Sequence, residues 1–128
     1  MKPQISYLAS PYSDPDLWVR ESRFWGAARA TVALMRRGLI VYSPIVHSHH
    51  IASNYGLPTD WAFWRRQQLP FLRVSKEVIV LCLRGWDTSI GVRSEIRLAR
   101  KWGIPVRYCD PITLKFSLWP PPIEKVNP

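Results

Sequence analysis

Short apolar runs alternate with amphipathic segments along most of this chain. Four runs predict strands and a less regular fifth adds one more, at residues 5–9, 39–42, 78–83, 106–109 and 112–118. The run Val78–Leu83 is continuous and rich in β-branched residues, as in strands that a parallel sheet buries on both faces. Because helical segments separate the strands, we expect an α/β fold of the flavodoxin/Rossmann-like class: a three-layer sandwich with a four- or five-stranded parallel sheet.

Capping residues set the expected limits of the first helix. Asp14 is a good N-cap with Pro15 at the first helical position, and Gly38 ends the helix. After the second strand, residues 43–60 are rich in Gly, Pro, Ser and His. This composition predicts a long loop that is suited to a binding site.

Two further helices follow that segment. Thr59 or Asp60 can cap the first of them, which we expect to end near Phe71 because Pro70 interrupts its last turn. The second surrounds Glu95 and ends at Gly103.

Glu95 lies on the face of its helix that should be buried. Its neighbours three and four residues away are Gly91, Val92, Leu98 and Ala99, so no cation on the helix is placed to pair with it. An inward carboxylate is costly unless it is hydrogen-bonded or lines a polar cleft. Two interpretations stay open: a functional carboxylate, or a glutamate that distant arginines or backbone donors satisfy.

The composition fits one compact domain. The chain has 128 residues, of which 47% are hydrophobic, and no apolar run reaches the roughly 20 residues that span a bilayer. We expect a cytoplasmic protein with its domain at 1–118 and a proline-rich tail at 119–128. Cys82 and Cys109 have no CxxC partner, which favours free thiols over a disulfide.

The positive charge points to anionic partners. Eighteen Lys and Arg residues against nine Asp and Glu residues give a net charge of +9, which attracts polyanions or phosphorylated small molecules. The charge is spread over helical surfaces, and no RGG, RNP or zinc-finger pattern accompanies it. We therefore do not expect nucleic acid as the partner.

Three segments should meet beyond the carboxyl ends of the strands, where open parallel sheets bind ligands: 10–13, 43–60 and 84–91. The last of them opens the helix of Glu95, so its free N–H groups favour a phosphate or carboxylate. Neither a Walker A sequence nor a Gly-x-Gly-x-x-Gly sequence occurs, so nucleoside triphosphate hydrolysis and hydride transfer lack support.

Three motifs resemble the nucleoside 2-deoxyribosyltransferase superfamily, which includes the 2′-deoxynucleoside 5′-monophosphate N-hydrolases. They are Tyr7–Tyr12 (YLASPY), Gly38–Pro44 (GLIVYSP) and Gly85–Glu95 (GWDTSIGVRSE). The resemblance implies that Glu95 is the nucleophile at the anomeric carbon of the sugar. It also implies that Tyr7 orients this carboxylate, although a plain strand aromatic is the alternative.

The resemblance also implies a substrate-binding set. Ser89 would bind a 5′-phosphate or 5′-hydroxyl, and Asp87 would bind a sugar hydroxyl or cap the helix. The remaining expected binding residues are Ser10, Gly91, His47, Trp64 and Gln68.

Two positions depart from the family pattern. Relatives carry an acidic residue that assists the leaving base, and the aligned residue here is Gln68, which cannot transfer a proton. The arginine that some monophosphate hydrolases carry after the first strand is replaced by Ser13, and Arg20 or Arg23 would have to reach the site from the first helix.

The cluster of histidines at 47–50 has three interpretations: a zinc site, a histidine lining the base pocket, and exposed loop residues. A third set of ligands with suitable spacing is not visible, so we expect neither a metal nor another cofactor. Trp61 and Trp64 can stack on a base.

Seven tryptophans in so small a domain predict an interface between subunits. Relatives form dimers or higher oligomers in which the neighbouring chain completes the site, so we expect a homo-oligomer. We therefore predict a nucleoside or nucleotide N-glycosidase or deoxyribosyltransferase. The alternatives are a nucleotide-binding protein without turnover and a basic nucleic-acid-binding module.

Overall fold

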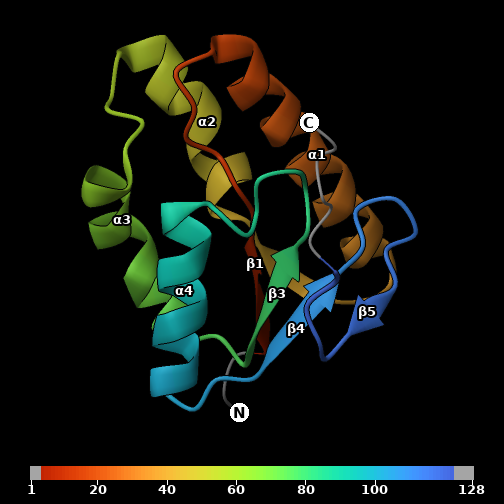
Figure 1. Cartoon of the computed structure of the whole chain (residues 1–128). Helices are drawn as coiled ribbons and strands as arrows, with labels where there is room; N and C mark the ends of the chain where they lie inside the picture. Colours follow the sequence, from red (N-terminus) through yellow and green to blue (C-terminus); the bar gives the residue numbers. More distant parts are fainter. Residues whose placement is uncertain (1–3, 123–128) are drawn as a thin grey trace.

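The computed structural model describes residues 4–122, which form an α/β fold with a five-stranded sheet in the order β2-β1-β3-β4-β5 (Figure 1). The first four strands are parallel, and β5 is antiparallel to β4. This architecture is flavodoxin-like and confirms the predicted fold class. The strands are β1 (Ile5–Ala9), β2 (Ile40–Tyr42), β3 (Glu77–Leu81), β4 (Val106–Cys109) and β5 (Phe116–Ser117).

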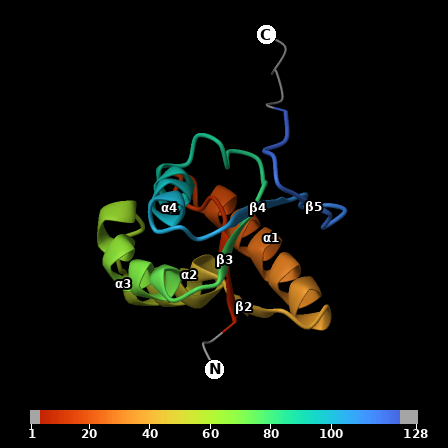
Figure 2. The same cartoon turned by 90° about the horizontal axis from the view of Figure 1, so that it is seen from below.

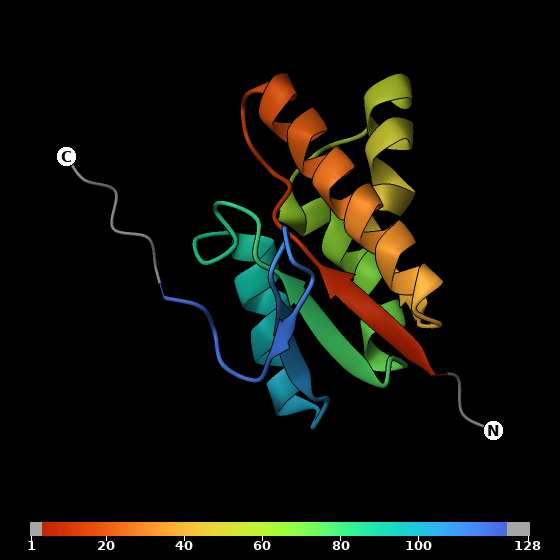
Figure 3. The ribbon, with the colours of Figure 1, turned by 90° about the vertical axis from the view of Figure 1, so that its right-hand side faces the viewer.

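Helices cover both faces of the sheet (Figure 2). Side chains alternate along each strand, so Leu8 packs against α1 (Leu17–Arg36) on one face. Tyr7 lies on the other face, in the core that α3 (Trp61–Arg73) and α4 (Ile90–Lys101) cover. Figure 3 shows α2 (Pro44–Tyr55) beside α1. None of the helices among the described residues is long and apolar enough to cross a membrane.

The 43–60 segment is not the predicted loop, because most of it is α2. Ser43 caps this helix by accepting a hydrogen bond from the backbone N–H of Val46, Pro44 occupies the first turn, and Gly56 ends it in the left-handed conformation. Ile45, Ser48, His49 and Ala52 are buried at helical spacing, and the polar atoms of Ser48 and His49 are hydrogen-bonded. Because Ser48 and His49 are polar, the sequence does not show the apolar periodicity that would have predicted this helix.

Two helix limits also differ from the prediction. The N-cap of α1 is Asp16, whose carboxylate accepts from the backbone N–H of Trp18, whereas Asp14 accepts from the backbone N–H of Asp16. Pro70 does not end α3, which continues to Arg73. Pro70 is exposed on the helix, and the buried Leu72 holds the last turn against the core.

The fifth strand is shorter than predicted and runs in the opposite direction. Asp110 accepts hydrogen bonds from the backbone N–H groups of Ile112 and Thr113, and the chain turns back at Leu114. Such a turn is too short for a parallel crossover, so β5 pairs with β4 as a hairpin. Beyond it, 119–122 form no regular element and 123–128 of the predicted tail lie outside the described residues.

An ion pair ties the sheet together at the amino end of β3. Glu77 accepts two hydrogen bonds from Arg107 at 2.7 and 3.0 Å and one from Ser6 at 2.6 Å. Burial acts to raise the pKa of Glu77, but these donors lower it below its ordinary value. Cys82 and Cys109 are free thiols, as predicted.

Candidate functional site

A cavity of about 390 Å³ lies beyond the carboxyl ends of β1 and β3. The chain leaves β1 toward β2 on one side, while β3 pairs with β1 on the other. The cavity therefore occupies the switch point at which open α/β sheets bind ligands. Its lining comes from the segments after β1 and β3 and from all four helices.

Glu95 lies in this cavity with its side chain turned inward from α4. It is only 4% exposed, and the hydroxyl of Tyr7 on β1 donates a hydrogen bond to its carboxylate. The same hydroxyl lies 3.5 Å from the Oε1 atom of Gln68 on α3. The structure thus brings together the predicted nucleophile, its predicted orienting residue and Gln68, one of the predicted binding residues.

Burial controls the ionisation of Glu95. Loss of solvation raises the pKa of Glu95 to about 8, and the hydrogen bond from Tyr7 lowers it by less. Burial, followed by the nearby charge of Glu95, raises the pKa of Tyr7 well above its ordinary value. The positive end of α4 does little to offset this effect of burial, because Glu95 lies beyond the first turn of the helix.

Ser89 and Gly91 form the mouth of the cavity at the start of α4. Ser89 is the N-cap, and its hydroxyl accepts from the backbone N–H of Val92 at 3.2 Å. A side chain at Gly91 would place its Cβ 3.3 Å from the Trp61 ring. Asp87 does not cap the helix, because Ser89 takes that position, and it is not among the residues that line the cavity. Its binding of a sugar hydroxyl stays a prediction.

Arg23, not Arg20, brings a positive charge to the cavity. Its guanidinium donates to the backbone oxygens of Tyr12 and Ser13 and lies against Gly85, where an added Cβ would be 2.6 Å from Nη2. Arg20 donates instead to the backbone oxygen of Asp14.

Ser10 contributes an unpaired polar group to the same cavity. Its side chain is buried, and among the described residues its hydroxyl has no hydrogen-bond partner. A buried hydroxyl without a partner is costly. Ser10 is therefore well suited to bind a polar group of a ligand.

A second cavity of about 250 Å³ adjoins the first, with Trp64 and Gln68 lining both. Trp64 is held in place by a 2.6 Å hydrogen bond from its indole N–H to the backbone oxygen of Pro58. His47 lines only the second cavity, beside Tyr42 and the stacked ring of Phe71. The expected binding residue His47 is therefore separated from Glu95.

The other histidines of this cluster lie between α1 and α2. Ligand atoms of Glu21, His49 and His50 are within 4.8 Å of one another, which makes them the candidate metal ligands among the described residues. His47 does not belong to this group. Glu21 and Tyr12 were not among the predicted site residues. The hydroxyl of Tyr12 lies 2.6 Å from Nδ1 of His49. No sequence spacing indicated this cluster because three separate segments form it.

These features define a flavodoxin-like α/β protein with a buried carboxylate in the cavity at its switch point. The chain belongs to the family described as a domain of unknown function (DUF1937), which matches residues 4–110. Among curated proteins, no sequence matches this chain. The family match covers every residue of the cavity lining.

Substitution of Glu95 should alter how stability depends on pH. The folded state keeps the carboxyl protonated up to about pH 8, whereas the unfolded chain releases this proton near the ordinary pKa of 4.5. The free energy of unfolding therefore falls as pH rises between these values, by at most about 5 kcal/mol. Glu95→Gln does not titrate, so it should unfold at higher urea concentration than the wild type at pH 8.5 and show a smaller difference at pH 5.

Asp87→Asn is the matched control because it also replaces a carboxylate by an amide near the cavity. Urea unfolding of all three proteins at both pH values measures the effect. The same pH dependence in Glu95→Gln and in the wild type would contradict a raised pKa at Glu95.

Proposed function

We propose that this protein is a nucleoside or nucleoside 5′-monophosphate N-glycosidase or deoxyribosyltransferase in which Glu95 is the nucleophile. The supporting observation is a buried carboxylate in the cavity, held by a hydrogen bond from the hydroxyl of Tyr7. Burying a carboxyl group here lowers stability above its unfolded pKa, and a catalytic role accounts for that cost. The resemblance of the three sequence motifs supports the same chemistry.

In the first step, a carboxylate oxygen of Glu95 attacks the anomeric carbon of the sugar. The glycosidic C–N bond breaks, and its electron pair leaves with the base. The resulting ester is then attacked at the same carbon by water or by the nitrogen of a second base, which restores Glu95. Tyr7 remains hydrogen-bonded to the carboxyl group and keeps its oxygens in position.

The mouth of the cavity suits a 5′-phosphate. Ser89 and the free backbone N–H groups at the start of α4 offer donors, and Arg23 offers a positive charge. The unpaired hydroxyl of Ser10 is one more hydrogen-bond donor. Trp61 and Trp64 line the same cavity and provide aromatic surface for the base.

Gln68 favours a second candidate, a protein that binds nucleotides without turnover. Its buried amide lies near Tyr7, at the position where the resemblance places an acidic residue. An amide cannot protonate the leaving base. The basic nucleic-acid-binding module is a third candidate, and its support is the net charge of +9.

Self-association is part of the proposal. On α1, Trp18 and Trp25 are 78% and 64% exposed, and Val32 continues the same seven-residue spacing on the surface. Large exposed aromatic side chains at regular spacing are typical of subunit interfaces. We therefore expect at least a symmetric dimer. The cytoplasmic location stays a prediction from the sequence.

Glu95→Gln should reduce base release by 10²-fold or more, a loss of about 2.7 kcal/mol in transition-state stabilisation. Released base is measured by chromatography from deoxynucleosides and their monophosphates. Because the carboxylate is the reactive form, the wild-type rate should increase with pH up to about 8, the raised pKa of Glu95. Equal rates in Glu95→Gln and in the wild type would refute Glu95 as the nucleophile.

Ser89→Ala should weaken the binding of a phosphate at the start of α4. A deoxynucleoside monophosphate should raise the melting temperature of the wild type more than that of the variant, because the variant lacks the Ser89 hydroxyl. The matched nucleoside without phosphate serves as the control. Tight oligonucleotide binding with a steep salt dependence, and no response to monophosphates, would support the nucleic-acid module instead.

The α1 surface predicts the oligomeric state. Light scattering over a concentration series should give a mass of at least two 14.9 kDa chains, and the double variant Trp18→Glu, Trp25→Glu should be a monomer. Trp119→Glu changes an equally exposed tryptophan outside α1 and serves as the control. A wild-type monomer at micromolar concentration would refute the dimer.

A further inference from the structure

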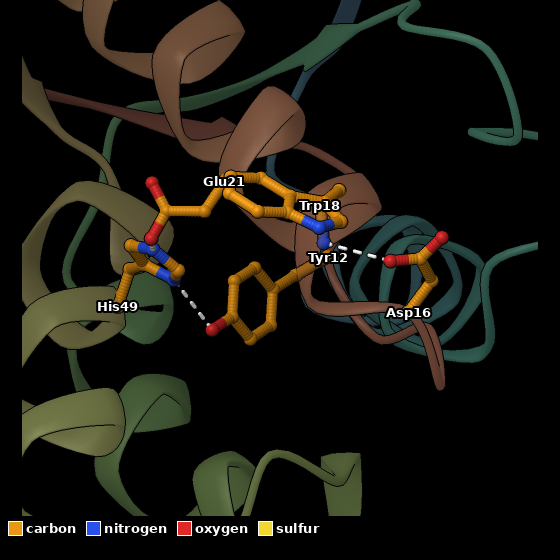
Figure 4. Close-up of polar contacts among 5 residues, drawn as sticks. All are labelled: Tyr12, Asp16, Trp18, Glu21 and His49. Atoms are coloured by element: carbon orange, nitrogen blue, oxygen red, sulfur yellow. Dashed lines mark hydrogen bonds and ion pairs between the residues drawn. The ribbon is translucent and has the colours of Figure 1, made fainter.

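Three side chains with metal-binding atoms meet where α1 packs beside α2. They are Glu21 on α1 and the consecutive residues His49 and His50 on α2. One ligand atom from each of them lies within 4.8 Å of the other two. Figure 4 shows Glu21 and His49 pointing toward one another from the two helices. The third ligand that the spacing of the histidines did not reveal in the sequence therefore comes from α1.

The separations of these atoms suit a single metal ion. Nitrogen and oxygen ligands lie about 2.0 to 2.2 Å from a tetrahedral zinc ion, so two such ligands are about 3.3 to 3.6 Å apart. Nε2 of His49 and Oε1 of Glu21 are 2.7 Å apart, and no pair in the set is more than 4.8 Å apart. The zinc separations fall between these two values. Small turns of Glu21 and of the exposed His50 are enough to bring all three atoms to bonding distance.

The ring of His49 is already oriented as a metal ligand. It is fully buried and stacks on Phe24 with ring centroids 4.8 Å apart, and its Nδ1 atom lies 2.6 Å from the hydroxyl of Tyr12. A histidine that binds a metal through one ring nitrogen usually donates the N–H of the other to an oxygen, which fixes the ring. The Tyr12 oxygen is placed to accept from Nδ1, and this leaves Nε2 as the atom that faces Glu21.

Burial gives this group an inner and an outer side. His49 is buried, Glu21 is partly buried and His50 is exposed. A cation can therefore arrive from solvent beside His50, and a water molecule can complete its coordination there. Two histidines, one glutamate and one water form a ligand set that zinc adopts where it keeps an open position.

We propose that Glu21, His49 and His50 bind one divalent transition-metal ion of the zinc class, with water as the fourth ligand. Two of the three protein ligands are imidazole nitrogens, which suit zinc, whereas Mg²⁺ and Ca²⁺ take oxygen ligands. The ion replaces the hydrogen bond between His49 and Glu21 and joins α1 to α2. The site is independent of the proposed N-glycosidase function, because none of its three ligands lines the cavity of Glu95.

Zinc binding is measured on the full chain without an affinity tag, after a chelator has been applied and removed. Titration calorimetry should find one Zn²⁺ per chain, and Mg²⁺ should not bind at the same concentrations. Zinc at about 100 times its dissociation constant should raise the melting temperature by about 5 to 15 °C, because the ion binds the folded state.

Two variants each remove one ligand. His50→Ala changes an exposed side chain, so its melting temperature without zinc should stay within about 2 °C of the wild type. Its zinc affinity should fall by about 10-fold or more. Glu21→Gln keeps an oxygen that accepts a hydrogen bond from Nε2 of His49 but lacks the negative charge, and it should lose zinc affinity to a similar extent.

His47→Ala and Cys82→Ser are the matched controls. His47 lies on the same helix as two of the ligands but outside the group, and Cys82 is a partly buried free thiol. Imidazole and thiolate are both common zinc ligands, so these variants test for binding elsewhere. Both should bind zinc as the wild type does.

Two results would overturn the proposal. If the wild type takes up no zinc at millimolar concentration, Glu21 and His49 form a hydrogen-bonded pair that needs no metal. If His50→Ala and Glu21→Gln bind zinc as tightly as the wild type, the ion lies elsewhere, and a loss confined to His47→Ala or Cys82→Ser would locate it there. Base release, measured separately with and without zinc, tests the proposed function, and its absence would leave the zinc result unchanged.

Discussion

The hydrogen bond between Tyr7 and Glu95 is the interaction on which the cavity depends. It joins the central strand β1 to α4 and gives a buried carboxyl group a hydrogen-bond donor. Without that donor, α4 could not place a glutamate against the sheet without a large desolvation cost. Leu72 of α3 and Val92 of α4 pack in the same core as Tyr7, so the position of the carboxyl group is set by the fold itself.

Much of the fold follows from hydrophobic periodicity. The continuous apolar run before residue 84 identified the central strand β3, and alternation of strands with helices identified a parallel sheet. The inward orientation of Glu95 could also be predicted from the sequence, because its helix has a clear apolar stripe and Glu95 is a charged residue on that stripe. The antiparallel direction of β5 could not be predicted in the same way. Whether a strand is parallel or antiparallel to its neighbour depends on the connecting turn and not on the alternation of apolar and polar residues.

Contacts between distant segments were harder to predict. The buried face of α2 contains Ser48 and His49, and their burial depends on partners that only the folded chain provides. Arg20 and Arg23 are equivalent in the sequence, yet only Arg23 reaches the cavity, because it lies against Gly85 where there is no side chain. Asp87 precedes α4 closely enough to resemble a cap, but Ser89 takes that position. These outcomes depend on geometry at the scale of single side chains.

Trapping of the ester on Glu95 tests the proposed nucleophile most directly. A 2-fluorinated arabinosyl nucleoside slows both steps, because fluorine destabilises the developing positive charge on the sugar, and allows a glycosyl–protein ester to accumulate. Mass spectrometry of the intact protein should then show one added fluorosugar, and peptide mapping should place it on Glu95. Stoichiometric base release without an adduct, or an adduct on another carboxylate, would contradict the role assigned to Glu95.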